Sequence, residues 1–319
     1  MFGFGSAICS STLPGGPIGP CPDVDVGGYP TPGVTFDRAY LDVTAYGLNW
    51  RLGRQTYRLG PIGLLFSEGS LNIFAGDSVG ADGLKVTGSF GPVSFEASSF
   101  TVGTFPAGSI NAAYWIMMGR ASMQLMPGWT FGVNVMSERC NQNCGTPLTS
   151  NGWGVDVSGT IIPGVTLTAE YATFTPDALL GAFTNTTAYQ VNTVWNLGQL
   201  TGMTQFSPTL TIQYKNYGSG FFPLYRGGGD LFGINYTNNY QAWNVQLNMT
   251  FSPLFRPYVQ YESGSYISTG SPVTELELGF RSQVTTGVTA RFRYQRRDDI
   301  SLGPNPRTHR YRLQIDASW

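Results

Sequence analysis

The sequence has few charged residues and lacks any long apolar run. Charged residues make up 12% of the 319 residues, against roughly 25% in an average soluble domain. The formal net charge of −1 and the lack of a dense basic stripe argue against a nucleic-acid partner. No segment approaches the roughly 20 consecutive apolar residues that a membrane-spanning helix requires. If the chain crosses a bilayer, it must do so as a closed β-barrel, because lipid leaves open sheet edges without hydrogen-bond partners.

Histidine is almost absent, which limits the chemistry that the chain can support. The single His309 cannot build a zinc or copper site alone, so we expect no metal and no cofactor. A hydrolytic site that combines His309 with Asp298 or Asp299 and a serine is the weakest alternative. We therefore expect no enzyme activity, and interpret His309 as a residue at the rim of the fold.

The four cysteines occur as two local pairs in segments rich in Gly, Pro and Asn. This spacing predicts the disulfides Cys9–Cys21 and Cys140–Cys144 in an oxidising compartment. The alternative for the second pair is a metal clip, but no further Cys or His pair lies nearby in the sequence.

Apolar and polar residues alternate along most of the chain. In residues 309–319 the apolar residues occupy odd positions and the polar residues even positions, which predicts a strand with two different faces. The same alternation covers residues 129–135, 243–251 and 288–294. A strand with one face in lipid, one in water and aromatic residues at the interfaces is typical of a transmembrane barrel. The predicted interfacial tryptophans are Trp129, Trp153, Trp243 and Trp319.

Short and long connections follow one another between the alternating segments. Gly91-Pro92, Pro127-Gly128 and Pro163-Gly164 are tight turns, whereas residues 140–152 and 217–239 form long polar links. This pattern predicts an all-β, transmembrane antiparallel β-barrel of about 14–16 or more strands, with short periplasmic turns and long extracellular loops. A soluble sandwich or propeller is the alternative, and would need a second layer over its apolar face.

The domain boundary is predicted at residue 34. Residues 1–33 are an irregular Gly/Pro-rich loop, plug or linker, and residues 34–319 form the barrel. About fifteen strands can be counted, an odd number where single-chain bacterial barrels are normally even. Residues 1–5 also lack the features of an export signal. We therefore expect a mature segment or a fragment of a larger barrel.

Charged residues recur at positions predicted to face the lumen. The predicted basic pore-lining residues are Arg38, Arg51, Arg54, Arg58, Arg281, Arg291, Arg293, Arg310 and Arg312. The predicted acidic ones are Glu96, Asp156, Glu170, Glu262, Glu275, Glu277 and Asp316. Opposite charges on facing walls would set a transverse field that filters solutes. The alternative is a set of ion pairs between adjacent strands that only stabilise the wall.

Two short motifs carry a family resemblance. Gly53-Arg54-Gln55 is followed by Gly60 and Gly63, and then by Asp82-Gly83. This pattern resembles the start of many porin barrels, and is most similar to that of the S-layer-homology (SlpA-type) outer-membrane proteins of Deinococcus–Thermus bacteria. The resemblance implies a C-terminal porin-like barrel behind a stalk and a domain that binds cell-wall polymers. We expect Gly60 and Gly63 to let the chain fold inward, and Arg54 to line a constriction.

These observations predict an outer-membrane porin that passes small hydrophilic solutes or ions by passive diffusion. Its expected partners are outer-membrane lipid, the solutes themselves, peptidoglycan or a cell-wall polymer through upstream domains, and further copies of the chain; nucleic acid is not expected. The alternative function is a structural envelope barrel, associated with an S-layer, whose lumen is plugged by residues 1–33 and 55–80 or whose pore is incidental.

Overall fold

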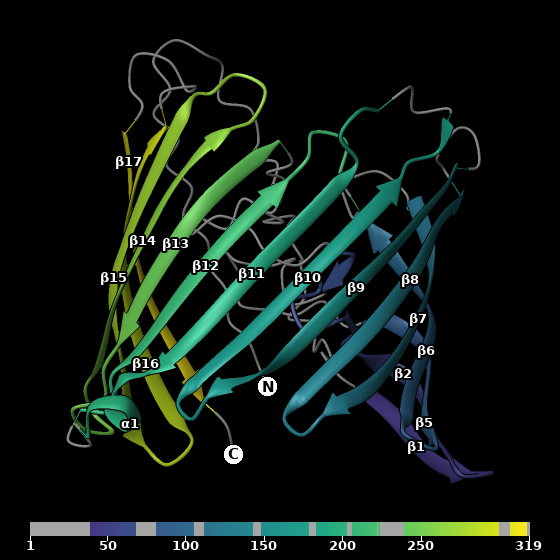
Figure 1. Cartoon of the computed structure of the whole chain (residues 1–319), viewed down its shortest axis with the longest axis horizontal. Coiled ribbons are helices and arrows are strands. Elements are labelled where there is room, and N and C mark those ends of the chain that lie inside the picture. Colours follow the sequence, from purple (N-terminus) through teal and green to yellow (C-terminus); the bar gives the residue numbers. More distant parts are fainter. Residues whose placement is uncertain are drawn as a thin grey trace, which may run out of the picture.

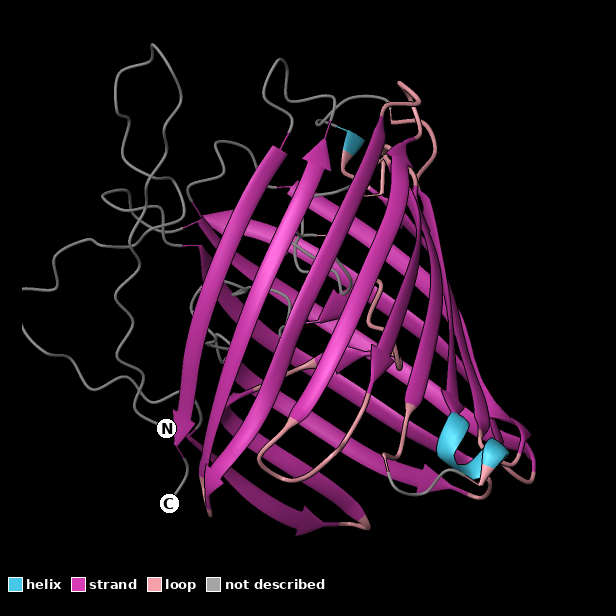
Figure 2. Cartoon of the chain, turned by 90° about the vertical axis from the view of Figure 1, so that its left-hand side faces the viewer, coloured by secondary structure: helices cyan, strands magenta, loops and turns pink. Residues whose placement is uncertain are grey.

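The computed structural model describes residues 39–67, 81–104, 112–142, 148–178, 183–202, 206–221, 223, 239–299 and 307–317. Almost all of these residues form strands (Figure 2). One 15-stranded antiparallel sheet contains all but two of the strands, in chain order. No helix in these ranges is long and apolar enough to cross a membrane.

The large sheet runs from β1 to β17 without a crossover, which confirms the predicted antiparallel topology. Its strands are β1 (Ala39–Ala45), β2 (Leu48–Gln55), β5 (Ala81–Phe90), β6 (Val93–Thr104), β7 (Ala112–Met126), β8 (Trp129–Gln142), β9 (Leu148–Ile162), β10 (Val165–Thr175), β11 (Thr187–Asn196), β12 (Thr209–Tyr217), β13 (Tyr240–Asn248), β14 (Arg256–Tyr266), β15 (Pro272–Thr285), β16 (Val288–Asp299) and β17 (Arg307–Ala317). The separate pair is β3 (Arg58–Leu59) with β4 (Phe66–Ser67).

The connections divide the sheet into two ends. Tight turns such as residues 91–92, 127–128 and 163–164 join strands at one end, which we call the short-turn end. The single described helix, α1 (Leu197–Thr201), lies at this end (Figure 1). The longer connections lie at the opposite, long-loop end. The sheet is strongly curved (Figures 1 and 2), and we call the space on its concave, inward side the lumen. In the described part of the chain β1 and β17 have no register with each other.

The outward face of the sheet is apolar. Val133 and Val135 on β8 share this face with Val155 and Trp153 on β9. Aromatic side chains form a row near the long-loop end, where the rings of Tyr214 and Trp243 lie 4.8 Å apart. Near the short-turn end, a second row includes Phe255 and Phe280, with ring centroids 6.0 Å apart. Two aromatic rows that flank an aliphatic band are the features expected of a lipid-facing barrel surface.

The inward face is largely polar, as the alternation predicts. One row of register partners with polar side chains runs across it from Thr168 through Asn192 and Gln213 to Asn244. The side-chain amide of Gln213 donates to Asn192 Oδ1 at 3.0 Å, and that of Gln260 donates to Asn244 Oδ1 at 3.1 Å. These groups satisfy one another on the wall of the lumen, where water can solvate the remainder.

Candidate functional site: the lumen and its inward hairpin

The connection after β2 folds into the lumen. Residues 57–67, which include the paired β3 and β4, form a structure that we call the inward hairpin, inside the curve of the sheet (Figure 1). Its turn contains Gly60 at φ +81° and Gly63 at φ +79°. Both values lie in the left-handed region that glycine adopts without steric cost. The geometry agrees with the role that the sequence predicted for these two glycines.

The inward hairpin is held by apolar packing. Its buried side chains are Tyr57, Leu59, Ile62, Leu64, Leu65 and Phe66. The ring of Tyr57 stacks on that of Phe100 from β6, with centroids 3.9 Å apart. Phe66 meets the same ring edge-on at 5.1 Å. The hairpin therefore buries an apolar cluster inside a lumen whose walls are otherwise mostly polar.

The wall carries a matching apolar patch on its inward face. This patch belongs to the same buried cluster and consists of Phe100, Ile116, Met118, Met136, Ala172, Phe174, Ala188 and Tyr217. These residues come from β6, β7, β8, β10, β11 and β12. The hairpin thus packs against one side of the lumen, and the wall formed by β13–β17 faces it without sharing this cluster.

Glu170 on β10 anchors the turn of the hairpin to the wall. Its carboxylate accepts hydrogen bonds from the backbone N–H groups of Ile62 at 2.9 Å, Gly63 at 3.0 Å and Leu64 at 2.8 Å. Three successive N–H groups around one anion form a cradle of the kind that turns present to anions. Because Glu170 is buried, these bonds lie in a region of low dielectric constant, where they are stronger than in water.

A second carboxylate lies beside this anchor. Asp156 on β9 is the register partner of Glu170. It accepts hydrogen bonds from Arg120 at 2.6 Å and from the Asn134 amide at 2.8 Å. Like charges directly opposite each other in a sheet are destabilising. Separate positive partners, the guanidinium for Asp156 and the backbone N–H groups for Glu170, make this pair tolerable.

The facing wall carries a ladder of arginines in its short-turn half. Arg256, Arg281 and Arg291 are register partners on β14, β15 and β16. Arg293 lies one step further toward the long-loop end, opposite Arg312 in the backbone register. Arg256, Arg281 and Arg293 form no ion pair with any carboxylate of the described residues. These arginines therefore place positive charge on the inward face of this half of the wall, and their effect on solutes stays a prediction.

Further toward the long-loop end several charges on β12–β16 are paired. Lys215 and Glu262 form an ion pair at 2.8 Å, with their side chains 1% and 0% exposed. Arg297 lies 3.0 Å from Glu275 and 2.7 Å from Asp299. The contact of Arg297 with Glu275 joins the adjacent strands β16 and β15, as in the predicted alternative. Arg297 and Asp299 instead lie on the same strand, and Lys215 on β12 lies two strands away from Glu262 on β14. Both interpretations of the inward charges stay predictions.

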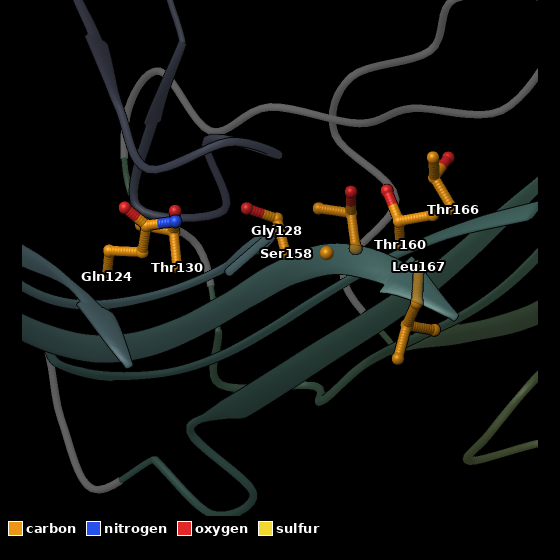
Figure 3. Close-up of a pocket in the computed structure, with 9 residues that line it drawn as sticks. Gln124, Gly128, Thr130, Ser158, Thr160, Thr166 and Leu167 are labelled. Carbon is orange, nitrogen blue, oxygen red and sulfur yellow. The ribbon is translucent and has the colours of Figure 1, made fainter. Parts of the chain in front are cut away.

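A third part of the lumen surface is uncharged. A shallow hollow of about 320 Å³ at the short-turn end is lined by Gln124, Thr130, Ser158, Thr160, Thr166 and Thr168, together with Gly128, Gly159 and Leu167. Figure 3 shows the hydroxyl groups of Thr130, Ser158 and Thr160 on one side of the strands and Leu167 on the other. Solutes at this end thus meet hydroxyl and amide groups on one wall and arginines on the other.

The register places most of the predicted pore-lining residues on the inward face. They are Arg51, Arg281, Arg291, Arg293, Arg310, Glu96, Asp156, Glu170, Glu262, Glu275 and Glu277, with Arg312 and Asp316 at inward register positions. Arg58 lies on the inward hairpin, where it donates to the Ile62 carbonyl at 3.0 Å. Arg38 lies outside the described residues. The contribution of these side chains to a pore remains a prediction.

Arg54 requires a correction. Its register partner is Asp82, it pairs with that carboxylate at 2.8 Å, and both lie on the outward face with Thr101. Gly53 precedes it at φ +123°, where a strand departs from regular geometry. Arg54 therefore lies on the outer rim and does not line a constriction.

The remaining predicted site residues have mixed outcomes. Trp129, Trp153 and Trp243 lie on the outward face, and Trp243 is 58% exposed. Cys140 is disulfide-bonded, whereas Cys144, Cys9, Cys21 and Trp319 lie outside the described residues, so both pairings remain predictions. In the described ranges, no group of three or more His, Cys, Asp or Glu side chains is placed to hold a metal ion.

The apolar patch under the hairpin was not among the features predicted from the sequence. Its signal is the run Tyr114–Met118 on β7, which is apolar on both faces. A lumen-facing position in a water-filled barrel is expected to be polar. Ile116 and Met118 break that rule, and such a break marks a wall segment that another part of the chain covers.

The fold is similar to that of several solved outer-membrane proteins. No protein-family model matches the sequence, and no curated protein matches it. Pseudomonas aeruginosa OccK10 (OpdN) is similar in structure, with a TM-score of 0.61 and 13% identity over 87% of this chain and 82% of that chain. Pseudomonas aeruginosa OccK3 (OpdO) has a TM-score of 0.62 and 13% identity, with 88% and 78% covered. The outer membrane protein OpdK of the same organism has a TM-score of 0.61 and 15% identity, with 87% and 78% covered. The chain therefore has the fold of the outer-membrane β-barrel porins.

Proposed function

We propose that the chain is an outer-membrane porin through which small hydrophilic solutes cross by passive diffusion. The observation that carries this function is the sorting of side chains on the same strands, apolar outward and polar inward. Val133 and Val135 on β8 face outward, whereas Asn134 between them faces the lumen. Such strands have lipid on one side and water on the other.

The inward hairpin supports a specific route for solutes. It packs on the wall from β6 to β12, so among the described residues the part of the inward face that the hairpin leaves uncovered lies along β13–β17. There Arg256, Arg281 and Arg291 occupy one register row. Like charges in direct opposition weaken a sheet, so the presence of three arginines in one row favours a function that uses the charge. An excess of fixed positive charge along the route favours anions over cations.

Conductance across a planar bilayer tests this function. The purified chain is expected to give stable current steps, with a reversal potential in a salt gradient that shows anion preference. The variant Arg281→Gln with Arg291→Gln should reduce this preference while steps persist. The matched control is Arg296→Gln with Arg307→Gln, which removes the same charge from the outward face and should leave selectivity unchanged. The absence of steps in the intact chain would refute the pore, and equal effects of both variants would refute the route.

We also propose that the barrel is related to the barrels of the S-layer-homology outer-membrane proteins. Gly60 and Gly63 of the shared pattern lie in the turn of the inward hairpin, which gives that pattern a physical role. Under this proposal residues 1–33 form a segment distinct from the barrel, and peptidoglycan or a cell-wall polymer is bound through other domains. The chain itself should then fail to co-sediment with purified peptidoglycan. Its oligomeric state can be measured by light scattering in detergent.

A further inference from the structure

Charged residues at outward register positions lie at only one end of the described strands. The cations are Arg54, Arg139, Arg296 and Arg307, and the acids are Asp82 and Asp298. All six lie at the long-loop end, and the described strands carry none at the short-turn end. A charge that faces lipid is costly at the bilayer midplane and tolerated near either interface. Avoidance of lipid therefore explains the position at a rim but does not explain the choice of one rim.

The β16–β17 pair shows this rim most clearly. Its outward register pairs, taken from the middle of the strands toward the long-loop end, are Phe292 with Leu313, Tyr294 with Tyr311, Arg296 with His309, and Asp298 with Arg307. Toward the long-loop end, the outward side chains of this pair therefore change from apolar residues to tyrosines and then to cationic residues. Tyrosine marks the level of the lipid headgroups in membrane proteins, so the cations lie at the height where lipid phosphates are found.

The cations at this level are ordered and remain accessible. Arg296 donates from Nε to Asp298 Oδ2 at 3.0 Å, and Arg307 donates from Nε to Asp298 Oδ1 at 2.7 Å. The Arg307 side chain is nevertheless 58% exposed. The Tyr294 hydroxyl lies 3.0 Å from His309 Nδ1. Two arginines share one carboxylate, so the cluster has one positive charge in excess and guanidinium N–H groups directed away from Asp298.

We propose that Arg296, Arg307 and His309 bind the phosphate of an anionic lipid headgroup at the long-loop side of the membrane. Guanidinium groups bind phosphate oxygens through charge-assisted, often paired, hydrogen bonds. Asp298 occupies part of the hydrogen-bonding capacity of both guanidinium groups, and Tyr294 and Tyr311 contact the lipid below its phosphate. This proposal rests on the membrane location proposed above.

Titration with phosphatidylglycerol tests the site, with bound lipids counted by native mass spectrometry of the detergent-solubilised chain. The variant Arg296→Gln with Arg307→Gln should bind the tightest lipid about tenfold more weakly. The matched control, Arg256→Gln with Arg281→Gln, removes the same charge from the lumen and should bind lipid like the parent chain. Parent-like binding by the rim variant, or an equal loss in the lumen variant, would overturn the proposal.

Asp298→Asn provides a second, independent variant. A lipid phosphate competes with the Asp298 carboxylate for the same guanidinium groups, so this change should strengthen phosphatidylglycerol binding severalfold. Weaker binding would show that the cluster is only an internal ion pair and would overturn the site. Bilayer conductance of each variant is measured in parallel. A variant that loses lipid binding but keeps its current steps has lost only the lipid site at the rim. If the parent chain itself gives no current steps, the proposed pore function fails, whatever the lipid binding.

Discussion

Replacement of Glu170 tests whether one carboxylate holds the inward hairpin in the lumen. Glu170→Ala removes the acceptor for three buried backbone N–H groups, those of Ile62, Gly63 and Leu64. Each unsatisfied buried donor costs about 1–3 kcal/mol. The docked state should therefore lose roughly 3–9 kcal/mol, reduced to the extent that water enters the gap.

This loss of free energy is large compared with the net free energy that the other contacts contribute to docking of the hairpin. Each buried apolar side chain contributes about 1.5–3 kcal/mol, whereas each ordered residue costs about 1–2 kcal/mol of backbone entropy. Over residues 57–67 these two terms are of similar size, because about half of the side chains are buried. The hydrogen bonds to Glu170 therefore decide the balance, and their removal should release the hairpin.

Single-channel recording measures the release. Glu170→Ala should populate a wider, noisier conductance state, and Glu170→Gln, which keeps one acceptor oxygen, should do so less. The matched control is Glu277→Gln on the facing wall, where the carboxylate is bonded to Tyr258 and Gln295 and does not touch the hairpin. If Glu170→Ala keeps the conductance and noise of the parent chain, then apolar packing alone holds the hairpin and the reasoning is wrong.

Three further predictions concern the wall and the hairpin turn. Gly60→Ala should mimic a milder Glu170→Ala in conductance, because its Cβ would lie 2.8 Å from a Glu170 oxygen; parent-like recordings would contradict this. Lys215→Met should lower the free energy of unfolding by about 3–5 kcal/mol, because it leaves the buried carboxylate of Glu262 without its cation. Arg51→Gln, which breaks an exposed ion pair, should lower it by only about 0–1 kcal/mol. Thermal denaturation in detergent compares the two variants, and equal losses would contradict the burial of the Lys215–Glu262 pair. Val133→Arg on the lipid face should cost about 2–4 kcal/mol in folding into vesicles, whereas the lumen-facing Thr168→Arg should fold like the parent chain, and the reverse order would invert the assigned faces.

The fold could be predicted because period-two alternation records which side of the sheet meets lipid. Residues 129–135 on β8 and 288–294 on β16 alternate without interruption, and the structure confirms their faces. The tight turns at residues 91–92 and 127–128 are also confirmed. Both signals are local, so a single sequence is sufficient to detect them.

The inward hairpin could only be predicted in part. Glycines at 60 and 63 indicated an unusual turn, but its contacts with Glu170 and Phe100 join residues far apart in the sequence. Alternation alone cannot report which wall a loop will cover. Arg54 was misplaced for a different reason. It lies three positions after the inward-facing Arg51, so alternation itself places it on the outward face, and the register of β2 with β5 continues through Gly53 without a shift.

The charge that a solute would meet in the lumen depends on which inward carboxylates are buried or paired with a cation. Asp156 forms an ion pair with Arg120, and Glu170 accepts hydrogen bonds from three backbone N–H groups of the hairpin. Both carboxylates are buried, so neither lies exposed to a solute. Glu262 is likewise paired with Lys215. Arg281, by contrast, has a tyrosine ring 5.9 Å away and no ion pair with a carboxylate of the described residues. A net charge of −1 for the whole chain is therefore consistent with the proposed anion-selective route along β14–β16, because ion pairs compensate several of the inward acids and leave Arg256, Arg281 and Arg293 without a carboxylate partner among the described residues.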